Sequence, residues 1–224
     1  MDVVSDAISA VRVGRPSSDR VRVGGSWCTR IAPYDGAGFH VVLAGSCWLH
    51  PDDGDSIRLG TGDAVLLPRG TGHVIADSRP DGAAVARAVP FEEWHDGAPR
   101  SGRGDVEMLC GKYRLDRTRA HPLLAELPST VHLPHRVGSH PELRAVIDLL
   151  GRELDGPHPG THIVMPGLLD LFLVYLIRSW MAEGGTGAWP AALSDPVTTS
   201  ALQALHADPA APWTTARLAA EAGV

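Results

Sequence analysis

Four side chains in the first half of the chain carry groups that bind soft metal ions: His40, Cys47, His73 and Cys110. All four lie in segments whose composition favours β-strands, and imidazole together with thiolate suits zinc. Because the four residues come from different strands, their spacing along the chain does not establish that they meet. The direction of Cys47 also stays open, because Gly45 interrupts its strand. A zinc site built from these four residues is therefore one hypothesis.

The same two cysteines suggest a redox site as a second hypothesis. Cys47 lies near His50 in the sequence and Cys110 lies near Lys112, and a neighbouring positive charge lowers the pKa of a thiol. Neighbouring residues on a strand point to opposite faces, however, so this sequence argument is weak. Buried and inert thiols are the favoured interpretation of Cys47 and Cys110, and the redox role stays open.

The most specific pattern is the segment from Gly62 to His73, which has the spacing G-x5-P-x-G-x2-H. Gly62 with Asp63 is expected to turn the chain into a strand, and Pro68 with Gly70 to turn it out again. His73 then begins the next strand, where its side chain can point into a barrel. The segment resembles the second sequence motif of the cupin barrels at every fixed position.

The first cupin motif is incomplete in this chain. Metal-binding cupins carry two histidines separated by one residue, then a glutamate, ahead of the next glycine. The corresponding segment 34–45 offers only His40, which lies closer to Gly45 than the usual glutamate does. The chain is therefore not expected to be an enzyme. A small metal-dependent cupin enzyme, an isomerase or an oxygenase, is the alternative hypothesis.

The elements that must position these residues change in kind along the chain. Residues 20–115 contain short apolar segments separated by turn residues at intervals of roughly 8–12 residues, which is typical of a sandwich or barrel. The polar segment 92–104 is predicted to be a mobile loop. From about residue 118 the apolar period becomes helical, with helices expected from Ser139 and over 163–182. The expected fold class is α+β, an antiparallel cupin-type barrel followed by helices.

The helix over 163–182 is apolar on nearly every face in its middle. Its own domain can cover one face, so a partner subunit is expected to cover the rest. The predicted dimerisation residues are Leu168, Leu169, Phe172 and Leu176. The alternative is a fully buried core helix. The longest strongly apolar run, 171–177, is far shorter than a membrane span.

The composition limits the function classes. The 26 acidic and 20 basic residues give a formal net charge of −6, so the chain lacks the overall basic character of a nucleic-acid binder. Three cysteines are too few for a disulfide-stapled secreted scaffold, and the first residues do not form a signal peptide. The cytoplasm is the expected compartment.

Along its whole length the chain resembles an AraC-type transcriptional regulator with an N-terminal cupin sensor. The similarity covers the barrel entry at 39–49, the motif at 62–73 and the segment 109–128. It also covers residues 213–224, which follow the linker at 184–187. These residues carry a threonine cap and look like the first helix of a helix-turn-helix.

The resemblance implies three parts: an effector-sensing cupin domain over 1–135, a helical dimerisation segment and linker over 136–190, and the start of a truncated helix-turn-helix domain over 191–224. The effector, which is a small molecule, a metal or an oxidant, is expected inside the barrel. The residues expected to bind it are His40, Trp48, His73, Met108 and Cys110. A homodimer is expected, with promoter DNA contacted only in the full-length protein.

Overall fold

The computed structural model describes residues 3–97, 105–116, 122–156, 158–185 and 187–224. Its strands form two five-stranded sheets. The first sheet has the order β1 (Ser17–Val23), β9 (Val106–Tyr113), β3 (Ala37–Ala44), β6 (Ala64–Leu67) and β10 (Val131–Leu133). The second has the order β5 (Ile57–Gly60), β4 (Ser46–Pro51), β7 (His73–Ala76), β2 (Cys28–Ile31) and β8 (Val89–Pro90). The pairs are antiparallel except β2 with β8, so the expected antiparallel fold is confirmed with that one departure.

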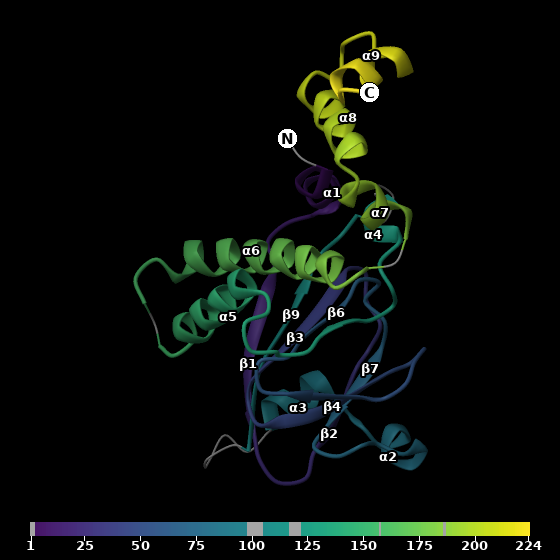
Figure 1. Ribbon diagram of the computed structural model, residues 1–224. Coiled ribbons are helices and arrows are strands. Elements are labelled where there is room, and N and C mark those ends of the chain that lie inside the picture. The colour runs from purple at the N-terminus through teal and green to yellow at the C-terminus, as the bar shows by residue number, and fades with distance from the viewer. Residues whose placement is uncertain (1–2, 98–104, 117–121, 157, 186) are drawn as a thin grey trace.

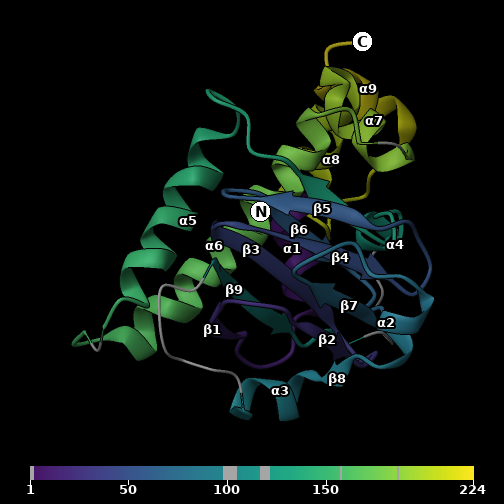
Figure 2. The ribbon, with the colours of Figure 1, turned by 90° about the horizontal axis from the view of Figure 1, so that it is seen from below.

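The helices lie on opposite sides of the two sheets. Helices α5 (Pro141–Glu153) and α6 (Thr161–Ala182) cover the first sheet, while α2 (Gly82–Ala86) and α3 (Phe91–Gly97) lie beside the second (Figures 1 and 2). The C-terminal helices extend away from the sheets, at the end where α1 and α4 lie (Figure 1). These remaining helices are α1 (Val3–Val11), α4 (Pro122–Ala125), α7 (Ala188–Ser194), α8 (Pro196–Ala207) and α9 (Thr215–Glu221).

The first sheet is buried on both of its faces. Strand β3 shows this directly, because its residues from Ala37 to Val42 are all buried. Phe39 and Val41 join an apolar cluster with α5 and α6, whereas Val42 joins a second cluster with residues of the other sheet. A strand covered on both faces needs a continuous apolar run rather than an alternating one. The molecule therefore has two cores that share one sheet.

Helix α6 packs its most apolar side against this sheet. Leu168, Leu169, Phe172 and Leu176 are buried within the single chain. The rings of Phe172 and Phe39 are 5.1 Å apart, and the Tyr113 hydroxyl donates a 2.6 Å hydrogen bond to the carbonyl of Leu169. The prediction that these four residues form a dimer contact is therefore wrong, because the sheet already covers them.

The outer side of α6 carries other apolar residues. Ile163 is 82% exposed and Leu171 is 46% exposed, and Val164 lies beside them. Among the described helices, α6 alone is long and apolar enough to cross a membrane by length and composition. The residues on its buried side, however, belong to the apolar core that it forms with the first sheet and α5. Packing within the chain therefore accounts for most of its apolar character.

Side-chain caps mark the starts of the C-terminal helices α8 and α9, whereas α1 and α3 were not predicted from the sequence. The Asp195 carboxylate caps α8 by accepting from the Thr198 N–H, and Thr214 caps α9, which is the threonine cap expected from the sequence. The predicted loop over 92–104 is wrong in its first part, where α3 ends at Gly97, and residues 98–104 lie outside the described part of the chain. Helix α1 had no clear sequence signal.

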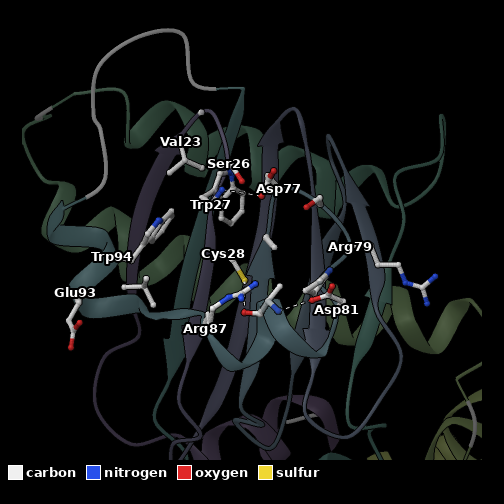
Figure 3. Close-up of a pocket in the computed structure, with 16 residues that line it drawn as sticks. Val23, Ser26, Trp27, Cys28, Asp77, Arg79, Asp81, Arg87, Glu93 and Trp94 are labelled. Atoms are coloured by element: carbon white, nitrogen blue, oxygen red, sulfur yellow. Dashed lines mark hydrogen bonds between the residues drawn. The ribbon is translucent and has the colours of Figure 1, made fainter.

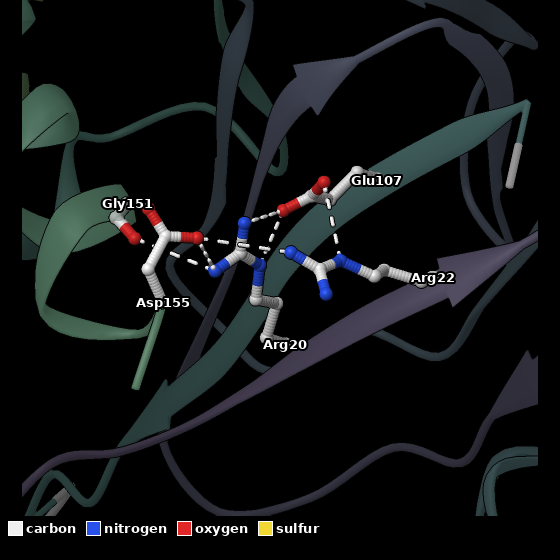
Figure 4. Close-up of polar contacts among 5 residues, drawn as sticks. All are labelled: Arg20, Arg22, Glu107, Gly151 and Asp155. Carbon is white, nitrogen blue, oxygen red and sulfur yellow. Dashed lines mark hydrogen bonds and ion pairs between the residues drawn. The ribbon is translucent and has the colours of Figure 1, made fainter. Parts of the chain in front are cut away.

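A cluster of charged groups joins the first sheet to the end of α5. Arg20 on β1 pairs with Glu107 on β9 and, at 2.6 Å, with Asp155 beyond the end of the helix (Figure 4). Arg22 adds weaker contacts to the same two carboxylates. The Arg20 side chain thus spans the boundary between sheet and helix layer. The pKa of Asp155 is lowered by its hydrogen bond from Arg20.

We expect Arg20→Leu to loosen the end of α5, because no other side chain of this cluster reaches it as closely. Backbone amides around Gly151 and Asp155 should exchange hydrogen severalfold faster than in the native protein, as measured by mass spectrometry. Arg22→Leu is the matched control, since Arg22 is more exposed, and should change exchange less. Equal protection in both variants and the native chain would rule out the anchoring role of Arg20.

Candidate functional site

One row of side chains crosses three strands of the first sheet on the face toward the second sheet. Asp19 of β1 pairs with Cys110 of β9, which pairs on its other side with His40 of β3. Residues directly opposite one another in antiparallel strands share a face. The three side chains therefore lie in line, and His73 of β7 meets the row from the second sheet.

These four residues line a cavity of about 250 Å³ between the sheets. His40, His73 and Cys110 are buried, whereas Asp19 is exposed at the rim. The remaining lining residues are Ser17, Ile31, Ala32, Pro33, Tyr34, Phe91, Glu92, Gly111 and Lys112. The cavity thus has a buried end formed by imidazoles and a thiol, and a rim with charges of both signs.

Five polar lining residues were not predicted as site residues from the sequence: Ser17, Asp19, Tyr34, Glu92 and Lys112. Asp19, Val21 and Val23 are every second residue of β1 and therefore share one face of the strand. Because Val21 and Val23 are apolar and are buried between the sheets, this spacing is the signal that could have placed Asp19 on the inner face. Tyr34 lies in a connection between strands, where no period applies.

The glycine–proline turn of the 62–73 segment positions His73. Gly70 has φ +58°, and a Cβ atom there would lie 2.2 Å from the carbonyl oxygen of Tyr34, so only glycine fits. The chain then enters β7 at His73. The Nδ1–H of this ring donates a 2.9 Å hydrogen bond to the carbonyl of Thr71, which fixes the direction of the ring. The expectation that His73 points inward is confirmed.

The two histidines form a hydrogen-bonded pair at the buried end of the cavity. Nε2 of His40 and Nε2 of His73 are 2.8 Å apart. Burial lowers the pKa of His73 to about 4. Burial, with a smaller effect of the neighbouring His73, also lowers the pKa of His40 well below its usual value. Both rings are therefore neutral near pH 7, and the pair offers hydrogen bonds rather than charge.

The four predicted zinc ligands do not converge. The Nε2 atoms of His40 and His73 face each other, while Sγ of Cys47 contacts Sδ of Met108 at 3.5 Å. In the part of the chain that the structure describes, no three or more His, Cys, Asp or Glu side chains gather as a metal site requires. The donor set does not fit a zinc site of the predicted composition.

Both cysteines of the redox hypothesis are buried thiols. Burial raises the pKa of Cys47 to about 12, with a further contribution from Asp63. Burial also raises the pKa of Cys110, as do the nearby Cys47 and Asp19. A reactive cysteine must be both deprotonated and accessible. Neither thiol meets that requirement, which favours the inert interpretation.

Two of the predicted effector contacts lie away from the cavity. Trp48 alternates on β4 with the buried Cys47 and Leu49, so it occupies the outer face, where the guanidinium of Arg79 is 5.8 Å from its ring centre. Trp48 therefore does not line this cavity, contrary to the expectation that it points into the barrel. Met108 faces inward, but it packs in the core between the sheets and does not line the cavity.

A larger cavity, of about 750 Å³, lies beside α2 and α3 (Figure 3). The rings of Trp27 and Trp94, 5.5 Å apart, form one part of its wall. Several of its polar groups already have partners within the protein. Asp77 accepts from the Trp27 N–H, Asp81 caps α2, and the Cys28 thiol contacts a carbonyl of α2 at 3.7 Å. The smaller cavity, with its buried histidine pair, is therefore the stronger candidate for a binding site.

The stability of the fold should fall as the pH drops from about 6.5 toward 4. In this window the unfolded chain protonates both histidines, whereas His73 stays neutral in the folded state down to about pH 4 and His40 also resists protonation. Each ring protonated only on unfolding contributes a slope of about 1.4 kcal/mol per pH unit. Well above pH 6.5 both histidines are neutral in the folded and the unfolded chain, so the pair no longer changes the free energy of unfolding with pH.

Urea unfolding between pH 7.5 and 5.5 measures this effect. A double variant, His40→Leu with His73→Leu, should lose the histidine slope while keeping cooperative unfolding. An identical slope in the native and double-variant proteins would contradict the neutral, buried state of the pair.

Comparisons with known proteins agree with the fold and the motif. The family model described as Cupin matches residues 2–182. The chain is 32% identical over its full length to a Streptomyces lividans protein described as an AraC-like transcription regulator, of which it covers 75%. It is 27% identical to the HTH-type transcriptional regulator AlkR of Acinetobacter baylyi, over 98% of this chain and 74% of that protein.

Among solved structures, a variant of apo ToxT from Vibrio cholerae aligns over 94% of this chain and 71% of its own, with 9% identity and a TM-score of 0.41. The resemblance stated from the sequence is confirmed by the family model and the relatives. The chain belongs to the family of AraC-like transcription regulators, and the cupin family model matches residues 2–182 of it.

Proposed function

We propose that the small cavity between the sheets binds the effector of a transcription regulator and that this chain is the sensing part. The observation that carries the proposal is the buried, neutral pair of His40 and His73 at a cavity inside an otherwise apolar core. Replacing both partners of a buried hydrogen bond by apolar groups of the same shape can be nearly neutral for stability. A binding site, by contrast, needs a few polar groups to orient its ligand.

Binding explains this site better than catalysis. Both ring nitrogens of His73 are engaged, one by Thr71 and one by His40, and the nearby Cys110 is a protonated thiol. Burial lowers the pKa of both imidazoles, so neither ring is a strong general base, and the site lacks an activated nucleophile. The relatives are named as transcription regulators. We infer a non-enzymatic regulator that works in the cytoplasm together with promoter DNA.

A route for the signal runs through strand β1. Asp19 lines the cavity, and its neighbour Arg20 points to the opposite face, where it holds Asp155 at the end of α5. An effector that displaces the rim at Asp19 therefore acts on a strand that is anchored to the helix layer. The exchange experiment on Arg20→Leu tests the helix half of this route.

We also propose a homodimer formed through the outer side of α6. Ile163, Gly167 and Leu171 follow one another at intervals of four residues, so they form one stripe on the helix. This stripe is exposed and carries two large apolar side chains, whereas the inner side is covered by the sheet. A second copy with the same stripe is the simplest partner for a symmetric contact.

We expect an effector to raise the melting temperature of the protein by about 5–10 °C at a concentration 100 times its Kd, because the gain is about 2.7 kcal/mol. A thermal-shift panel of small neutral organic molecules, zinc ions and peroxide covers the three classes of signal. Cys110→Phe should fill the cavity and abolish the shift, whereas Trp48→Phe, on the outer face, should retain it. A shift that survives Cys110→Phe, or a panel without any shift, would contradict the proposed site.

Leu171→Asp should convert the dimer into a monomer without unfolding it, because Leu171 is exposed in the single chain. Leu169→Asp, two residues away, should instead unfold the protein, since it places a charge in the core. Light scattering gives the mass and circular dichroism reports the fold. A dimer that persists in Leu171→Asp would show that α6 is not the interface.

A further inference from the structure

The hydrogen bonds of the histidine pair determine where its protons lie. The carbonyl of Thr71 can only accept, so Nδ1 of His73 carries the proton. A neutral imidazole has one N–H, so Nε2 of His73 is an acceptor. Nε2 of His40 must then donate to it across the 2.8 Å contact. This chain of assignments leaves Nδ1 of His40 without a proton, as a bare acceptor.

That nitrogen has no partner among the residues that the structure describes. His40 is only 4% exposed, and its Nδ1 is a buried atom without a hydrogen bond. A buried polar atom left unpaired costs about 1–3 kcal/mol. His40 lines the cavity, but neighbouring atoms cover its Nδ1, so a ligand supplies the missing donor only where these atoms make way for it.

The remaining walls indicate what kind of molecule carries that donor. Ile31, Pro33 and Phe91 offer apolar surface, whereas the charged Asp19, Glu92 and Lys112 belong to segments nearer the protein surface. A charged ligand group placed against the neutral histidines would lose its hydration without finding a counter-charge. The volume, about 250 Å³, lies just below the range of roughly 300–1,000 Å³ typical of pockets for drug-sized ligands.

We propose that the effector is a small, uncharged molecule with an apolar body whose hydroxyl or N–H group donates a hydrogen bond to Nδ1 of His40. The inference rests on the proposed function of the cavity and adds the chemical class of its ligand. It also predicts selectivity, because an analogue that can only accept hydrogen bonds leaves Nδ1 unpaired. Such an analogue should bind about 10–100 times more weakly.

The test uses phenol, which donates a hydrogen bond, and anisole, in which a methyl ether replaces the hydroxyl. Protein with ¹⁵N-labelled histidine first reports the tautomers by nuclear magnetic resonance, and Nδ1 of His40 should be unprotonated in the free protein. Titration should then show phenol shifting this resonance and binding at least about tenfold more tightly than anisole. A protonated Nδ1 in the free protein would overturn the inference at once.

Two variants complete the test. His40→Met, which keeps the volume but removes the acceptor, should bind phenol and anisole equally, and a cooperative melting curve confirms that it is folded. Trp48→Phe, on the outer face of β4 and away from the cavity, is the control and should keep the preference for phenol. Equal binding of the two probes to the native protein, or no binding of phenol, contradicts the inference. Zinc added alone should leave the ¹⁵N resonances of the two rings unchanged. A stoichiometric shift of both resonances would show that the pair is a metal site.

The thermal-shift panel separates this inference from the proposed function. If molecules bind in the cavity but those lacking a donor bind equally well, the ligand class is wrong and the sensing role stands. If no molecule of the panel protects the protein, the sensing role itself fails.

Discussion

The first sheet has both of its faces covered, and the rest of the structure is arranged around this constraint. One face packs against the second sheet and the other against α5 and α6. Neighbouring residues of a strand point to opposite faces, so each of its three central strands, β9, β3 and β6, contributes to two cores. In β3, Phe39 and Val41 pack in the core with the helices, while His40 and Val42 face the space between the sheets. Inserting or deleting one residue in such a strand would turn the residues that now face the helices toward the second sheet, and the others toward the helices.

The two cores differ in how they treat polar groups. In the core under the helices, the buried hydroxyl of Tyr113 is satisfied by the carbonyl of Leu169. In the core between the sheets, His40 and His73 satisfy each other and Thr71, and one nitrogen is left over. A closed core gains nothing from an unpaired acceptor. The same acceptor becomes useful where a cavity admits a molecule that can pair with it, which is why the cavity and the histidines belong to one site.

Sequence reasoning succeeded where a local pattern dictates geometry. The glycines and the proline of the 62–73 segment impose the turn that carries His73 inward, and Thr214 marks the start of the last helix. The sequence did not predict which face of α6 is buried, because that depends on which element of the fold covers each face. The apolar run of α6 does not say that Leu169 meets the sheet and Leu171 meets solvent, because both fit the same run.

Positions of other site residues required the assembled fold. Gly45, in the left-handed region at φ +79°, breaks the alternation between β3 and β4, so the side of Trp48 could not be carried across it. The row of Asp19, Cys110 and His40 depends on the register of three strands far apart in the sequence. The bare nitrogen of His40 follows only from the partners of His73.

The alternation of strand β1 also bears on how binding could be communicated. A ligand shifts a conformational equilibrium only by the difference between its affinities for the two arrangements. Asp19 is exposed at the rim of the cavity, and Arg20, the next residue, holds Glu107 and Asp155 on the other face. A contact that depends on the position of Asp19 therefore depends on the position of Arg20 as well, and through it on α5. Because the sheet separates the cavity from the helix layer by the thickness of one strand, this coupling needs no long chain of intermediate residues.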